Sequence, residues 1–154
     1  MENKFLHIYI ISMSEIIYKN FNYCIWLVPE INHSWHNIIS DFSPHISIKT
    51  HLQSSDISAL KYIIDTKPQI EVELVGNLYQ TKTDNFFAIQ CNVTITNQLV
   101  PDWWPSDSHI SFKYQYNIPF TDEEIADLES SVKEKKAICT NIILKLCNGH
   151  FSTW

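Results

Sequence analysis

The sequence contains no arginine, because all 11 of its basic residues are lysines. The planar guanidinium fork that proteins often use to bind phosphate is therefore missing. Any phosphate group would have to be held by histidine, serine, lysine or backbone N–H groups. The net charge of −6 also disfavours broad attraction to a nucleic-acid duplex. We therefore expect no DNA duplex as partner, and any nucleotide partner to be small or held locally.

Glycine is scarce, with two residues, and no glycine-rich phosphate loop is present, so a doubly wound dinucleotide fold is disfavoured. No Cys-x-x-Cys or His-Glu-x-x-His spacing occurs, and we expect no metal and no cofactor. The cysteines are far apart in apolar stretches, which favours reduced core residues and a cytoplasmic protein. They are Cys24, Cys91, Cys139 and Cys147.

Long apolar runs are also absent, and none approaches the roughly 18 residues of a membrane span. The apolar opening segment 5–11 is short and interrupted by His7, which argues against a signal peptide. With 154 residues, 45% apolar and 18% charged, the chain is expected to fold as a single soluble domain, 1–154, with no membrane partner.

The apolar pattern predicts an α+β protein. Thr121 and Glu124 form a capping box that opens a helix, acidic at its start and lysine-rich at its end, near Lys136. Residues 1–20 are compatible with a strand at 6–11, or with that strand followed by a short helix at 14–19. Strands are expected at 23–28, 45–50, 70–75, 86–93, 109–116 and 140–146, and further helices at 31–39 and from 54 to before Pro68.

A five-residue pattern occurs twice, as His45-Ile46-Ser47-Ile48-Lys49 and as His109-Ile110-Ser111-Phe112-Lys113. Side chains alternate between the two faces of a strand, so histidine, serine and lysine of each copy should share one face. The intervening apolar residues should face a core. Titratable and hydroxyl groups are costly to bury without partners. Two such faces therefore predict a shared polar cleft.

The residues around these two copies resemble the 2H phosphoesterase superfamily, in particular its cyclic phosphodiesterase branch. Phe42-x-Pro44-His45-Ile46-Ser47 resembles the first family motif, and His109-Ile110-Ser111-Phe112-x-Tyr114 resembles the second. Tyr23-x-x-Trp26-Leu27-Val28-Pro29 resembles the opening strand, and Phe151-x-x-Trp154 a terminal one. The resemblance implies a two-lobed fold with pseudo-symmetric lobes. In it, two antiparallel-type sheets form a central cleft, with helices outside.

The resemblance implies a metal-independent phosphodiesterase that uses two-histidine acid/base catalysis. His45 and His109 would exchange protons with the substrate, in an order that the sequence leaves open. Ser47 and Ser111 would hold the phosphate oxygens. Lys49 and Lys113 are not part of the family pattern, so their expected role in substrate binding rests only on strand alternation.

Other polar and aromatic residues carry weaker expectations. Trp103 and Trp104 lie between prolines just before the second motif, and two adjacent indoles are hard to bury together, so one is expected to stack on a nucleobase. Tyr114 falls off the period of His109 and is expected on the opposite face. Trp26 is expected in the core. His33 and His36 are expected in solvent.

The substrate class stays open at this stage. The resemblance and the acidic composition favour a 2′,3′-cyclic phosphate or a cyclic di- or oligonucleotide signal, and destruction of such immune signals by a virus would be one context. One alternative is processing of RNA 3′ ends, which should require a lysine-lined groove longer than one nucleotide. The other is a non-catalytic nucleotide- or RNA-binding module on the same fold.

Overall fold

The structure is a computed structural model that describes residues 23–66, 68–83 and 86–147. The expectations for 6–11, 14–19 and the terminal Phe151-x-x-Trp154 lie outside these residues. The strands are β1 (Tyr23–Pro29), β2 (Ile46–Lys49), β3 (Ile70–Lys82), β4 (Phe86–Ile95), β5 (His109–Tyr116) and β6 (Lys136–Leu146). The helices are α3 (Trp35–Ile38), α4 (Ser54–Thr66) and α5 (Asp122–Ser131).

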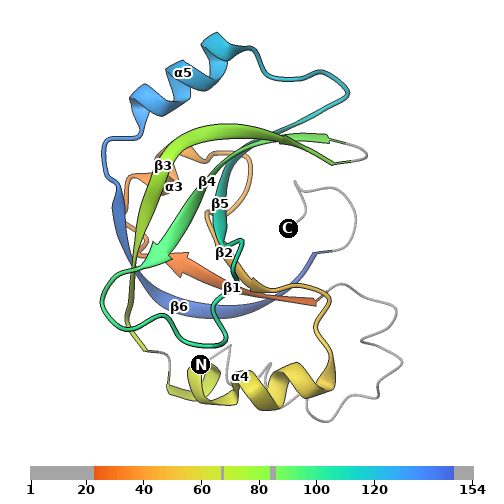
Figure 1. Cartoon of the computed structure of the whole chain (residues 1–154), viewed down its shortest axis with the longest axis vertical. Helices are drawn as coiled ribbons and strands as arrows, with labels where there is room; N and C mark the ends of the chain where they lie inside the picture. The colour runs from red at the N-terminus through yellow and green to blue at the C-terminus, as the bar shows by residue number, and fades with distance from the viewer. Residues whose placement is uncertain (1–22, 67, 84–85, 148–154) are drawn as a thin grey trace.

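The six strands form a closed barrel in the order β1-β2-β5-β4-β3-β6, and every neighbouring pair is antiparallel (Figure 1). The order contains two three-stranded halves, β2-β1-β6 and β5-β4-β3, and each half carries one copy of the repeated pattern. The α+β class is confirmed. The sheet arrangement differs from the expected pair of sheets, because β2 joins β5 at Ile46 and Ile110, and residues 70–73 of β3 pair with 136–139 of β6.

One apolar cluster contains residues from all six strands, so the side chains of one barrel face pack into a common core. In β2, Ile46 and Ile48 belong to this cluster, and in β5 Ile110 is fully buried within it. The alternation predicted for the first copy is therefore confirmed, with Ser47 half-buried and Lys49 exposed on the other face. Burial of the isoleucines fixes the register, since a slip of one residue would expose them.

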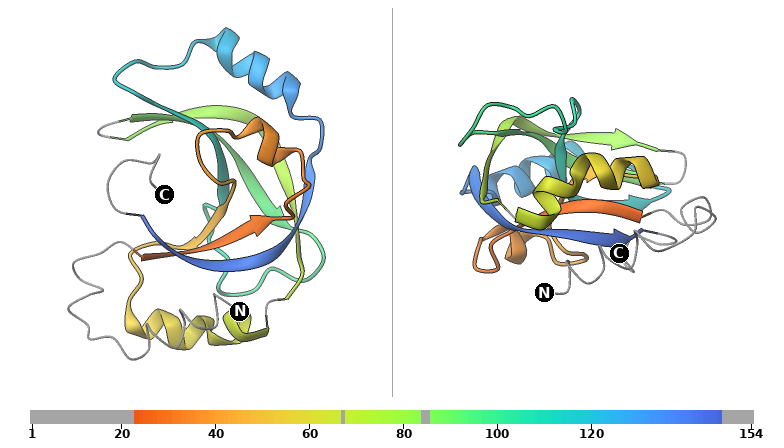
Figure 2. Two further views of the ribbon diagram at one scale, coloured as in Figure 1. Left: turned by 180° about the vertical axis from the view of Figure 1, so that it is seen from behind. Right: turned by 90° about the horizontal axis from the view of Figure 1, so that it is seen from below.

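The longer helices lie on opposite sides of the barrel, α4 next to β6 and α5 next to β3 (Figure 1). The view from below in Figure 2 shows α4 on the near side. The capping box of α5 is confirmed, because Thr121 accepts from the Glu124 N–H and the Glu124 carboxylate accepts from the Thr121 N–H. No helix in the described part of the chain combines the length and apolarity needed to cross a bilayer.

Helix α5 ends at Ser131, before the lysines that the sequence pattern placed in its last turn. Val132 leaves helical geometry and is buried in the core, and the chain then enters β6 at Lys136, whose Cα partner is Glu73. Burial of Val132 and pairing of the following strand thus override helix propensity.

Strand β3 is longer than expected. It continues past Gly76, whose φ of +73° suits glycine, through an irregularity between Val75 and Tyr79.

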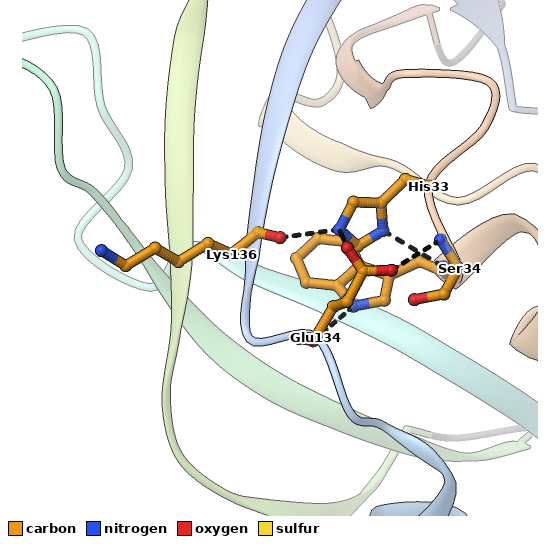
Figure 3. Close-up of polar contacts among 5 residues, drawn as sticks. His33, Ser34, Glu134 and Lys136 are labelled. Carbon is orange, nitrogen blue, oxygen red and sulfur yellow. Dashed lines mark hydrogen bonds and ion pairs between the residues drawn. The ribbon is translucent and has the colours of Figure 1, made fainter.

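A cluster of polar contacts ties the segment before α3 to the start of β6 (Figure 3). His33 Nε2 donates to the Lys136 carbonyl oxygen at 2.6 Å, and its Nδ1 accepts from the Trp35 N–H at 3.2 Å. The Glu134 carboxylate accepts from the Ser34 N–H at 3.3 Å. The expectation that His33 is solvated is therefore wrong, since its side chain is 8% exposed. The structure uses this histidine as an anchor between distant segments.

Candidate active site

The two copies of the repeated pattern meet where β2 joins β5. The Cα atoms of Ile46 and Ile110 are partners in an antiparallel ladder. Extending that register by one residue in each direction places His45 beside Ser111 and Ser47 beside His109. These four residues line one cavity of about 100 Å³, together with Cys24, Trp26, Thr50, Tyr114 and Cys147. The residues proposed as catalytic from the sequence are thus brought together.

His45 is a buried imidazole in a defined orientation. It is 7% exposed and is stacked on Trp26, with ring centroids 3.5 Å apart and an interplanar angle of 9°. Its Nδ1 lies 2.7 Å from the Ser43 carbonyl oxygen. Because a carbonyl oxygen only accepts, Nδ1 carries the proton, and Nε2 is left for a ligand.

Burial lowers the pKa of His45 to about 4, because the charged imidazolium loses its hydration. The Ser43 carbonyl opposes this effect, while the charges of His109 and Lys145 add to the lowering. Lys145 belongs to β6, where its Cα partner is Cys24, and its ammonium lies 6.0 Å from the centroid of the Trp26 ring. His45 is therefore neutral at pH 7 in the free protein.

His109 repeats the backbone contact of His45 in a more open setting. Its Nδ1 lies 2.9 Å from the Asp107 carbonyl oxygen, so the same ring nitrogen donates to the carbonyl two residues earlier in both copies. His109 is half-buried, whereas His45 is buried. Among the described residues, neither ring has a hydrogen-bond partner for its Nε2, but the two rings differ in access.

The second copy departs from strict alternation after Ser111. Gln90 pairs with Ser111 and Ile89 with Lys113, so β5 has one extra residue, Phe112, at a bulge. The bulge turns Tyr114 to the face of His109 and Ser111, where it lines the small cavity. The expectation that Tyr114 packs on the opposite face is wrong for this reason. Burial raises the pKa of its phenol, and a hydrogen bond with Ser111 opposes that shift.

The same bulge moves Lys113 away from the expected polar face. Lys113 is exposed, and its ammonium lies 5.9 Å from the centroid of the Phe120 ring. It lines neither the small cavity nor the larger one beside it. The expected common face of His109, Ser111 and Lys113 thus ends at Ser111, and no contact of Lys113 supports its expected role in substrate binding.

A larger cavity of about 470 Å³ adjoins the small one and shares Ser47, Thr50 and His109 with it. Three of the residues proposed for substrate binding, Lys49, Trp103 and Trp104, line this cavity. The two indoles are half-buried and meet edge to face, with centroids 5.9 Å apart. Its remaining lining residues are Ile48, Asp56, Leu60, Asp102, Pro105 and Asp107.

Three residues that line the small cavity were not expected there from the sequence, namely Trp26, Cys24 and Cys147. Trp26 was expected in the core, and it is buried, but it also lines the cavity and stacks on His45. Cys24 and Cys147 are buried thiols that line the same cavity. A hydrogen bond between them lowers the pKa of Cys24 and raises that of Cys147. Alternation in β1 indicates that Cys24 and Trp26 share a face, but their position beside β2 depends on the strand order.

Within the described residues, no group of three or more His, Cys, Asp or Glu side chains is close enough to hold a metal ion. No protein-family model and no curated protein matches the chain. Two structures of Kluyveromyces marxianus Usb1, one with uridine monophosphate, align over 86% of this chain and 97% of theirs, at 10% identity and a TM-score of 0.46. This similarity is too low to support an inference.

Proposed function

We propose that the protein is a metal-independent phosphodiesterase in which His45 and His109 act as the acid/base pair. The observation that carries the proposal is the matched pair of imidazoles at the small cavity, each with Nδ1 bonded to the carbonyl two residues earlier. Cleavage of a phosphodiester needs one group to remove a proton from the attacking oxygen and another to protonate the departing one. Two imidazoles with free Nε2 atoms meet that requirement.

The surroundings of the two rings assign their roles in this proposal. His45 is neutral at pH 7, because its pKa is lowered to about 4, so it is ready to accept a proton from water or a ribose hydroxyl. His109 is then the residue that protonates the leaving oxygen. In the alternative order, the buried ring would have to be charged before substrate binds, which its burial opposes.

Ser47 and Ser111 supply hydroxyl groups beside the histidine of the opposite copy, suited to donate to the non-bridging phosphate oxygens. The positive charge expected of Lys113 is better provided by Lys145, which acts on His45 electrostatically and lies close to Trp26. A phosphate in the small cavity would thus meet two hydroxyls, while Lys145, which does not line the cavity, would act on it only through its charge.

For the substrate, we propose a small nucleotide with a cyclic phosphate or a phosphodiester next to a 2′-hydroxyl. The small cavity has room for a phosphate rather than a nucleotide, and the adjoining one for a nucleoside. The second candidate is trimming of RNA 3′ ends. Against it, Lys49 is the one lysine that lines either cavity in the described part of the chain, and Asp56 pairs with it at 3.7 Å.

The test is turnover in the presence of EDTA. Substrates are 2′,3′-cyclic mononucleotides, cyclic di- and trinucleotides with 2′,5′ or 3′,5′ links, and a short single-stranded RNA. We expect His45→Ala and His109→Ala to lower kcat by about 1,000-fold or more, from the usual contribution of acid/base groups.

Asp127→Asn on α5, which lines neither cavity, is the control and should keep full activity. Cleavage of cyclic nucleotides supports the first candidate, and stepwise shortening of the RNA supports the second. Normal turnover in both histidine variants would contradict the proposed mechanism. Complete loss of turnover in EDTA would also contradict it, because the mechanism needs no metal.

A further inference from the structure

The larger cavity beside His109 has an excess of negative charge. Three of its lining residues are aspartates, Asp56, Asp102 and Asp107, against one lysine, Lys49. Lys49 is paired with Asp56. The exposed carboxylates of Asp102 and Asp107 make no hydrogen bond or ion pair with any residue in the ranges that the structure describes. They are therefore available to a ligand.

Because of this charge, the larger cavity suits a different chemical group from the small one. A second phosphate placed in the larger cavity would lie next to the carboxylates of Asp102 and Asp107 and be repelled by them. An uncharged group suits it better. Trp103 and Trp104 add aromatic surface on which a nucleobase can stack. A nucleoside fits the volume of about 470 Å³, which lies within the range usual for ligand pockets.

We propose that the larger cavity binds the nucleoside of the substrate, and that Asp102 and Asp107 select its base: guanine first, adenine and cytosine next, uracil last. The proposal rests on the proposed phosphodiesterase function, since a phosphate in the small cavity places its nucleoside next door. Ser47, Thr50 and His109 form the wall that the two cavities share. A nucleotide bound across that wall therefore reaches both of them.

The order of bases follows from hydrogen-bonding chemistry. An ionised carboxylate only accepts hydrogen bonds. Guanine offers two parallel donors, N1–H and the N2 amino group, which match the two oxygens of a carboxylate. Adenine and cytosine offer one amino group. Uracil has a single N–H between two carbonyl oxygens, and those oxygens would face the carboxylates unpaired, which is unfavourable.

The test is a binding measurement that does not need turnover. Isothermal titration calorimetry would compare the 3′-monophosphates of guanosine, adenosine, cytidine and uridine on the full-length protein. We expect the guanosine nucleotide to bind about 10-fold or more tighter than the uridine nucleotide, as one charge-assisted hydrogen bond allows. In Asp102→Asn/Asp107→Asn this ratio should fall to about threefold or less, while Asp127→Asn keeps it.

Equal binding of the four nucleotides, no binding of any of them, or an unchanged ratio in Asp102→Asn/Asp107→Asn would overturn the proposal. The substituted side chains are exposed, and circular dichroism would confirm that the double variant is folded. Failure of the phosphodiesterase proposal is a separate result. Base-selective binding without turnover of any substrate would reject the enzyme and keep the nucleoside site, and turnover without base selection would do the reverse.

Discussion

The segments around His45 and His109 share a sequence pattern and the same backbone hydrogen bond, yet they hold their imidazoles in different surroundings. His45 is enclosed, stacked on Trp26 and influenced by Lys145, whereas His109 is half-buried at the wall of the larger cavity. The contact that orients each ring is local to its strand. The contacts that set its burial come from other strands and loops. The repeated motif thus sets the orientation of each imidazole, while contacts from other segments set how deeply the imidazole is buried.

Removing Trp26 should reduce the difference between the surroundings of His45 and His109 more than any other change. Trp26→Ala deletes a buried indole, and we expect a loss of about 4 kcal/mol in the free energy of unfolding, as for other buried tryptophans. It should also raise the pKa of His45 toward its usual range by admitting water. Urea unfolding and NMR titration of the His45 ring would measure the two effects. Trp104→Ala is the control at the half-buried His109 side and should cost less than half as much; equal losses would contradict the contrast.

A pH series tests the burial of His45 directly. Its pKa is about 4 in the folded protein and 6.5 for an exposed ring, so the unfolded state binds the proton first as pH falls. The stability contributed by the neutral ring is present above pH 6.5 and is lost by about pH 4, a loss of about 3 kcal/mol.

Urea unfolding at pH 7 and pH 4 should show this loss in the parent protein. Between pH 7 and pH 4, the free energy of unfolding of His45→Gln should fall by about 3 kcal/mol less than that of the parent, because the variant has no imidazole to protonate at this position. His109→Gln serves as the matched variant and should keep most of the loss, because burial, the largest cause of the lowered pKa of His45, is unchanged. Identical pH dependence in the parent and His45→Gln would show that His45 is not held neutral by the fold.

The smallest expected effect distinguishes two lysines. Lys145→Ala should lower kcat/KM by about 10-fold, or about 1.4 kcal/mol, because it removes the ammonium near His45. Lys113→Ala should change kcat/KM by less than about twofold, since Lys113 lies against Phe120 and lines neither cavity. Steady-state kinetics on whichever substrate of the turnover panel is cleaved gives both values. The reverse ranking would restore the role that alternation assigned to Lys113.

The parts of the site that the sequence predicts are those encoded within one strand. Alternation of apolar and polar residues places Ile46 and Ile48 in the core and Ser47 opposite them, because burial of two isoleucines is a strong, local constraint. The bulge at Phe112 has no comparable signal. A single extra residue reverses the faces of Lys113 and Tyr114, and only the pairing with β4 reveals it.

Long-range contacts account for the rest of what the sequence did not predict. Trp26 stacks on His45 because β1 lies beside β2, with Trp26 opposite Ser47. Strand order is a property of the whole barrel, so a run of apolar residues in 23–28 predicts the strand but not its partner. The end of α5 shows the same limit. Helix propensity favours continuing through the lysines, and burial of Val132 stops the helix earlier.

The acceptors that orient the two imidazoles are main-chain oxygens, those of Ser43 and Asp107. A carbonyl is present whatever side chain its residue carries, so no point substitution at residue 43 or 107 can delete it. Where a carboxylate side chain orients a histidine, one mutation is enough to lose the tautomer. In this protein, the orientation of both rings therefore does not depend on the side chains at residues 43 and 107, as long as the backbone keeps its path.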